Sequence, residues 1–138
     1  MIQFLSECDF KFPFKKREIS KWIKDITSSK RFVCGDISYI FVDSARIVAV
    51  NVEFLQHDYP TDIITFDYTS DKIISGDIFI CPEVVKGNAI DFNTSFEEEL
   101  KRVIIHGILH LCGVTDKSVE EEFVMHREED AALLVFNK

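Results

Sequence analysis

The sequence contains no long apolar run. Its uninterrupted apolar stretches are only a few residues each, whereas a membrane-spanning helix needs about 20 apolar residues. The N-terminal stretch has acidic residues inside its apolar part and lacks the unbroken hydrophobic centre of a secretory signal peptide. Proline-rich runs, charge tracts and internal repeats are also missing. We therefore expect a cytoplasmic protein without a membrane partner, folded as a single domain over residues 1–138.

Cysteine and histidine are both scarce, and they are distributed differently. The four cysteines are scattered along the chain and include no Cys-x-x-Cys pair. Without an export signal, this pattern is typical of reduced, buried thiols rather than of disulfides or metal ligands. Two of the four histidines, in contrast, lie only four residues apart, at His106 and His110.

Basic residues are fewer than acidic ones, with 16 Lys and Arg against 24 Asp and Glu. The deficit is uneven, because residues 1–35 carry a net charge of +4 and the remaining residues carry −12. The overall acidity argues against a protein that coats nucleic acid generally, and we expect no DNA partner. The basic segment is either a solvated helix surface or a face that meets a polyanion, with Lys15, Lys16 and Lys21 as candidate contacts.

The hydrophobic pattern predicts interleaved helices and strands. Helices are expected at 15–28, at 45–56 (where the valines also fit a strand), from Pro82 to near Gly87, at 95–112 and at 118–133. Strands are expected at 37–45, 61–70 and 74–81, and a turn at 71–72 joins the last two as an antiparallel hairpin. This combination predicts an α+β fold with a small mixed β-sheet packed with helices.

The histidine pair falls on the helix expected at 95–112. Residues four apart on a helix share one face, and Gly113 can adopt the left-handed conformation that ends a helix and turns the chain. The turn would bring Asp116 back under the helix end, so that His106, His110 and Asp116 supply three ligands and leave a fourth position open, as in catalytic zinc sites. The same spacing would also arise from two core histidines paired with carboxylates, with Gly113 only as a helix cap.

Gly107 separates this pattern from that of the zinc peptidases. Their motif has a glutamate directly after the first histidine, and this glutamate acts as the general base. Glycine cannot take up a proton, and at this position it would leave room beside the metal. An ordinary peptidase is therefore disfavoured, and we assign no catalytic group beyond a metal-bound water.

Two other polar residues have structural interpretations. His126 lies ten residues beyond Asp116 and is expected at the surface rather than as a replacement ligand. Asp62 begins a predicted strand, where it would either hold a metal-bound histidine or cap a turn, and the turn cap is the expected role.

Three segments together resemble one protein family. HGILHLCGVTD (residues 106–116) resembles the YbeY signature His-Gly-x-Leu-His-Leu-x-Gly followed by Tyr, Asp and His. YPTDIITFDY and GDIFIC resemble the family's Thr-Asp-Val-Leu-Ser-Phe-Pro and Gly-Asp-Ile strands, in the same order and at the same spacing. The resemblance covers about residues 35–135.

The resemblance implies a fold, a cofactor and a function. The fold would be zincin-like, with the metal-binding helix near the C-terminus and one Zn²⁺ per chain. The function would be that of a single-strand-specific metallo-endoribonuclease in maturation of the small-subunit rRNA 3′ end and in ribosome quality control. Single-stranded or ribosomal RNA and the ribosome or its small subunit would be the partners.

The sequence departs from the family pattern at two positions. Asp116 stands where the family has its third histidine, and a carboxylate ligand also suits other divalent metals, such as manganese. Leu55 stands where many members carry an arginine beside the cleft, which removes a phosphate clamp. The candidate replacements for that arginine are His57, Lys117 and Arg127.

Two other functions stay open at this point. The first is a zinc-dependent hydrolase of another substrate class, such as a peptidase or amidase, on the same metal scaffold. The second is a non-catalytic ribosome-assembly factor in which the metal only organises the fold. Metal content and cleavage of single-stranded RNA would separate these from a nuclease.

Overall fold

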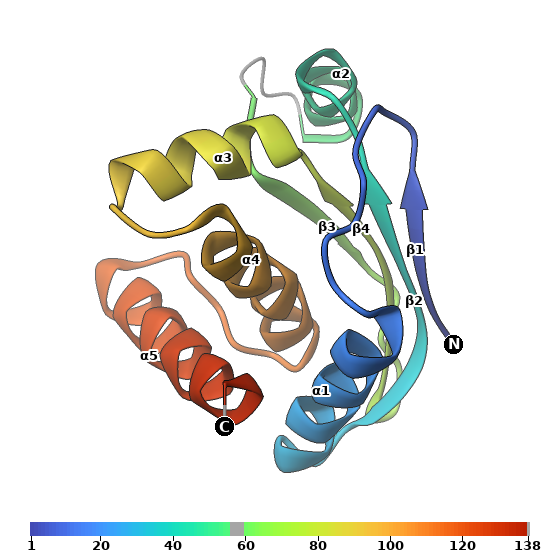
Figure 1. Cartoon of the computed structure of the whole chain (residues 1–138). Helices are drawn as coiled ribbons and strands as arrows, with labels where there is room; N and C mark the ends of the chain where they lie inside the picture. Colours follow the sequence, from blue (N-terminus) through green and yellow to red (C-terminus); the bar gives the residue numbers. More distant parts are fainter. Residues whose placement is uncertain (56–59, 138) are drawn as a thin grey trace.

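The computed structural model describes residues 1–55 and 60–137. One four-stranded sheet, in the order β1-β2-β4-β3, carries helices on both faces (Figure 1). The strands are β1 (Ile2–Ser6), β2 (Val33–Phe41), β3 (Ile63–Asp67) and β4 (Ile73–Ile80), and the helices are α1 (Lys16–Ser29), α2 (Ser44–Leu55), α3 (Pro82–Asp91), α4 (Phe96–Leu111) and α5 (Val119–Phe136). β1, β2 and β4 are parallel, and β3 is antiparallel to β4. The predicted α+β class with a small mixed sheet is confirmed.

The sheet separates two hydrophobic cores of unequal size. Successive side chains of a strand point to opposite faces, and in β2 Tyr39 and Phe41 join the larger core with α1, α4 and α5, whereas Ile40 joins the smaller core with α2. The Tyr39 hydroxyl donates to the carbonyl oxygen of Ile104 over 2.8 Å, which ties the sheet to α4. Within the described ranges, no helix is long and apolar enough to span a membrane.

α4 is the central helix of the larger core. It lies between the sheet and α5 (Figure 1), and ten of its sixteen residues are buried. The hydroxyl of Ser95 accepts from the backbone N–H of Glu98 over 3.1 Å, as its position before the helix predicted. At the other end Gly113 has a φ of 93°, the left-handed conformation predicted for it.

Gly107 marks the point where α4 comes closest to the sheet. A Cβ atom there would lie 2.9 Å from Cδ1 of Ile78 and 3.3 Å from Cδ1 of Ile63. The expectation that this glycine leaves room beside a metal is therefore wrong, because isoleucine side chains from β4 and β3 fill the space. The glycine instead permits close packing of helix and sheet.

Most predicted elements are present, with errors at their boundaries. The hairpin is confirmed, and its turn residues Asp71 and Lys72 both have positive φ. The strand expected at 37–45 ends earlier, at Phe41, because the Asp43 carboxylate accepts from the backbone N–H of Arg46 over 2.8 Å and starts α2. The helix expected to stop near Gly87 continues to Asp91, since a glycine inside an exposed helix costs only about 1 kcal/mol.

β1 is the element that the sequence pattern did not predict. It is a five-residue strand at the edge of the sheet, paired in parallel with β2. Ile2 lies opposite Ile37, so the pairing joins segments about 35 residues apart in the sequence. A strand this short carries little periodic signal of its own.

Candidate active site

A cleft of about 730 Å³ runs beside α4. Its lining comes from the start of β3, the α3–α4 turn, α4 itself, the loop after α4, and α5. The polar side chains of this lining include Asp62, Arg102, His106, Asp116 and Glu129. The cleft therefore gathers side chains from five separate parts of the chain.

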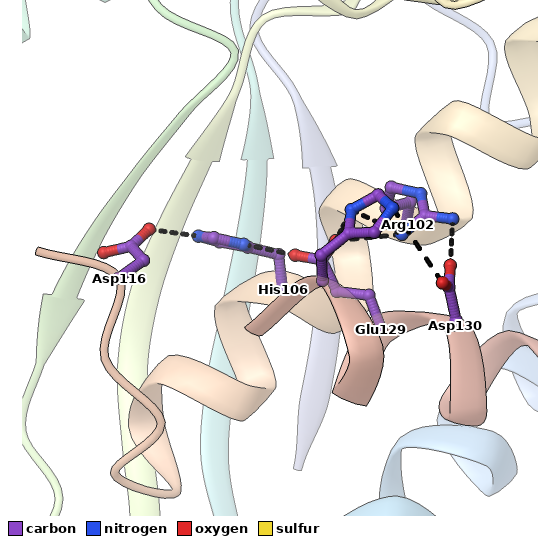
Figure 2. Close-up of polar contacts among 6 residues, drawn as sticks. Arg102, His106, Asp116, Glu129 and Asp130 are labelled. Carbon is purple, nitrogen blue, oxygen red and sulfur yellow. Dashed lines mark hydrogen bonds and ion pairs between the residues drawn. The ribbon is translucent and has the colours of Figure 1, made fainter. Parts of the chain in front are cut away.

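His106 occupies the middle of this group. Its imidazole lies between two carboxylates, Glu129 on one side and Asp116 on the other (Figure 2). Nδ1 lies 2.6 Å from Oε2 of Glu129, and Nε2 lies 3.4 Å from Oδ2 of Asp116. Because a carboxylate only accepts hydrogen bonds, Nδ1 is the donor to Glu129.

Glu129 is a buried carboxylate, only 6% exposed, supplied by α5. Its second oxygen, Oε1, accepts from Nη1 of Arg102 over 3.0 Å. Nη2 of Arg102 donates in turn to Oδ1 of Asp130 over 2.6 Å, at the outer end of the group in Figure 2. The Arg102 guanidinium thus offsets the charge that Glu129 carries into the protein interior.

The electrostatics of the cleft favour a positive charge at His106. Burial alone lowers the pKa of His106, but the Glu129 hydrogen bond and the charges of Glu129, Asp116 and Asp62 outweigh it, so the pKa lies above its ordinary value. Burial raises the pKa of Asp62, and the neighbouring His106 partly opposes this shift. A proton or a metal cation at His106 would therefore be stabilised by the surrounding carboxylates.

The donor groups of this site suit a divalent metal. A metal-binding histidine typically donates its other ring N–H to a carboxylate, as Nδ1 of His106 does to Glu129. Nε2 is then the free donor atom, and it faces Asp116 as the left-handed turn at Gly113 predicted. Among residues 1–55 and 60–137, however, no group of three or more His, Cys, Asp or Glu side chains is arranged to hold a metal ion. His110, half-buried one turn further along α4, is not among the residues that line the cleft, and its role as a ligand stays a prediction.

Replacing Gly113 with alanine is expected to destabilise the protein by roughly 1–2 kcal/mol, because alanine is strained at its φ of 93°. No heavy atom lies within 4 Å of an added Cβ, so the loss would report backbone strain alone. Gly87→Ala is the control: it also meets nothing within 4 Å but lies inside α3, so a gain of about 1 kcal/mol is expected. Urea denaturation measures the free energy of unfolding of both variants. Changes of the same sign in the two variants would contradict the role given to the Gly113 turn.

None of the described basic residues proposed as substrate contacts lines this cleft. Lys15, Lys16 and Lys21 are exposed at the start and along the outer face of α1, and Lys21 pairs with Asp25 over 2.9 Å. Of the described candidates for the missing clamp, neither Lys117 nor Arg127 lines the cleft. The third candidate, at position 57, lies outside the described residues. Their contacts with RNA stay predictions.

Arg102, Glu129 and His126 line the cleft, and sequence reasoning assigned none of them to the site. Arg102 carried a usable signal, since it lies four residues before His106 and so on the same helix face. Glu129 carried none, because it follows His106 by 23 residues on another helix. The His126 side chain is 63% exposed, as expected, yet its Nδ1 lies 3.4 Å from Nη1 of Arg102.

Comparison with known proteins gives consistent matches over most of the chain. The family model described as Endoribonuclease YbeY matches residues 5–137. The Endoribonuclease YbeY of Bacteroides fragilis (strain ATCC 25285) is 52% identical over 119 residues, covering 86% of each protein. That of Parabacteroides distasonis is 50% identical over 128 residues, covering 92% of this chain and 90% of the relative. That of Christiangramia forsetii is 45% identical over 136 residues, covering 99% and 94%.

The fold is also similar to a solved structure. The solution structure of TM1509 from Thermotoga maritima superposes with a TM-score of 0.67 at 29% sequence identity. The match covers 99% of this chain and 92% of that one. The similarity therefore extends over the sheet and all the helices that shape the cleft.

Proposed function

The chain belongs to the endoribonuclease YbeY family, which acts in ribosomal RNA processing, and we propose that it cleaves single-stranded RNA by metal-assisted hydrolysis in the cleft beside α4. The observation that carries the proposal is the His106 imidazole, fixed at Nδ1 by Glu129 and facing Asp116 with Nε2. This arrangement presents a ring nitrogen and a carboxylate oxygen to one point in the cleft.

The metal would be held by His106, His110 and Asp116. Zn²⁺ is the first candidate, and the carboxylate also suits other divalent metals. When bound, the ion would polarise a phosphate oxygen and activate a water nucleophile near neutral pH. The chain's own contribution is to orient the His106 ring through Glu129 and to supply the Asp116 carboxylate across from Nε2.

The charge of the cleft supports the need for a cation. Among the described lining residues five carry carboxylates, and only Arg102 carries a permanent positive charge (the carboxylates are Asp62, Glu98, Glu99, Asp116 and Glu129). Such a surface repels a phosphodiester at neutral pH. A bound divalent ion would offset part of this negative charge and give the phosphate a partner.

Gly107 weighs against the peptidase alternative. An added Cβ at this position would meet Ile78 and Ile63 of the sheet, so a glutamate there would extend into the helix–sheet contact. The position that supplies the general base in zinc peptidases therefore cannot do so in this fold.

The proposal extends to the biological setting. The substrate would be the 3′ end of small-subunit rRNA, and the partner would be the ribosome or its small subunit in the cytoplasm, with a further role in ribosome quality control. These assignments rest on membership of the family.

Asp116→Ala tests the proposal against a non-catalytic ribosome-assembly role. Asp116 is partly exposed, so the variant is expected to fold. Its far-ultraviolet circular dichroism should match the parent, while cleavage of a single-stranded RNA oligonucleotide should be lost. If the parent protein itself binds RNA but does not cleave it, the assembly role is favoured instead.

The basic segment of α1 gives a separate expectation about substrate binding. If Lys15, Lys16 and Lys21 contact the RNA backbone, the combined Lys→Glu variant should bind RNA more weakly, and the slope of log affinity against log salt should fall by about 0.7 per lost contact. Fluorescence anisotropy at several salt concentrations measures both quantities. Lys86→Glu, an exposed change on α3, serves as the control. Equal slopes in all three proteins would leave α1 as ordinary solvated surface.

A further inference from the structure

Glu129 divides its two carboxylate oxygens between two partners on α4. Oε2 accepts from Nδ1 of His106 at 2.6 Å, and Oε1 accepts from Nη1 of Arg102 at 3.0 Å. The residue is only 6% exposed, so water offers little competition for these bonds. Each oxygen therefore accepts one hydrogen bond, and the carboxylate has one orientation in which both bonds form together.

This geometry determines which nitrogen of His106 carries the proton. A neutral imidazole has one N–H, and the bond that this N–H makes decides which nitrogen is left as a donor to a metal. Glu129 accepts at Nδ1, which leaves the lone pair on Nε2, the atom that faces Asp116. With the proton on Nε2 instead, two acceptors would face each other at 2.6 Å.

We propose that Glu129 is the positioning residue that holds His106 in the Nδ1–H tautomer and aims Nε2 at the metal position. Arg102 holds the other oxygen of Glu129 through Nη1 over 3.0 Å. The inference rests on the proposed metal-binding function. It adds that α5, through one buried carboxylate, sets the metal affinity of a ligand on α4.

The tautomer of His106 is measurable without any variant. In the metal-free chain at a pH where His106 is neutral, two-bond ¹H–¹⁵N correlation spectra should show its proton on Nδ1. Addition of Zn²⁺ should leave that proton in place and shift the Nε2 resonance. A neutral His106 with its proton on Nε2 would overturn the inference. Failure of Zn²⁺ to bind, with the proton still on Nδ1, would instead overturn the proposed function.

Glu129→Gln tests the positioning role directly. The glutamine amide keeps the size of the side chain but has only one acceptor oxygen, so it turns an N–H group toward either Arg102 or His106. Loss of a hydrogen-bond partner to a metal-binding histidine typically costs 10–100-fold in metal affinity. We expect a weakening of about that size for Zn²⁺, measured by competition with a chromophoric chelator.

Asp130→Asn is the matched control. It alters the neighbouring residue of α5 and the other acceptor of Arg102, but it leaves the bond between Glu129 and His106 intact. Zn²⁺ affinity should stay at the parent value, while the contact between Arg102 on α4 and residue 130 on α5 is weakened. Equal losses of Zn²⁺ affinity in both variants would overturn the inference. They would mean that the attachment of α5 to Arg102, and not the orientation of His106, controls the site. A Glu129→Gln variant with the Zn²⁺ affinity of the parent would also overturn the inference. If that variant does not fold, the two-bond ¹H–¹⁵N spectra of the parent protein decide the question.

Discussion

Replacing His106 with alanine is expected to reduce the rate of RNA cleavage by more than about a hundredfold, since even the loss of a partner to a metal-binding histidine costs 10–100-fold. The substitution removes the nitrogen that faces Asp116 at 3.4 Å. Zn²⁺ affinity should fall with the activity, and kcat/KM with a single-stranded RNA oligonucleotide is the measurement.

His126→Ala is the control for the His106 substitution. His126 also lines the cleft and contacts Arg102, but its side chain is 63% exposed and belongs to α5. Its removal should leave Zn²⁺ affinity at the parent value. Because His106→Ala leaves buried Glu129 with Arg102 as its partner, thermal unfolding should confirm that the variant is folded before rates are compared. Equal losses of affinity in the two variants would contradict the central place given to His106.

Gly107→Glu is expected to destabilise the protein by about 3 kcal/mol or more, because it forces a charged side chain into the contact between α4 and the sheet. The first added atom would already lie 2.9 Å from Cδ1 of Ile78, which is fully buried. Chemical denaturation measures the free energy of unfolding. The same change should confer no peptidase activity.

Gly107→Ala separates the effect of size from that of charge. Alanine gains up to about 1 kcal/mol in helix propensity, and this offsets part of the strain against the Ile78 side chain. Its effect should therefore be much smaller than that of glutamate. A Gly107→Glu protein as stable as its parent would show that the glutamate turns into the cleft, and the argument against a peptidase would then fail.

The sequence predicted those parts of the fold whose causes are local. Ser95 before a run of glutamates and Gly113 after the last apolar residue identified both ends of α4, because capping acts within one helical turn. β1 escaped prediction, since its stability comes from pairing with β2 about 35 residues further along the chain. Gly87 misled the prediction of α3, because an isolated glycine weakens a helix without ending it.

The same distinction holds for the candidate site. His106 and Asp116 are ten residues apart and joined by one helix end and one turn, so their approach followed from local geometry. The spacing of four residues also places Arg102 on the same face of α4 as His106, but Arg102 was not assigned to the site from the sequence. Glu129 depends on how α5 packs on α4, which no local pattern of residues specifies. The resemblance to the YbeY signature pointed to ligands along one segment and not to the carboxylate that orients the first of them.

The most direct test of the account is RNA cleavage by the same protein sample with and without its metal. We expect purified protein to contain one divalent metal ion per chain and to cleave single-stranded RNA. Chelation should abolish cleavage, and addition of Zn²⁺ or Mn²⁺ should restore it. Because the carboxylates around His106 raise its pKa, a proton competes for the site, and restoration should need more metal as the pH is lowered. Metal-free protein, verified by elemental analysis, that cleaves RNA as fast as the metal-loaded protein would contradict the account.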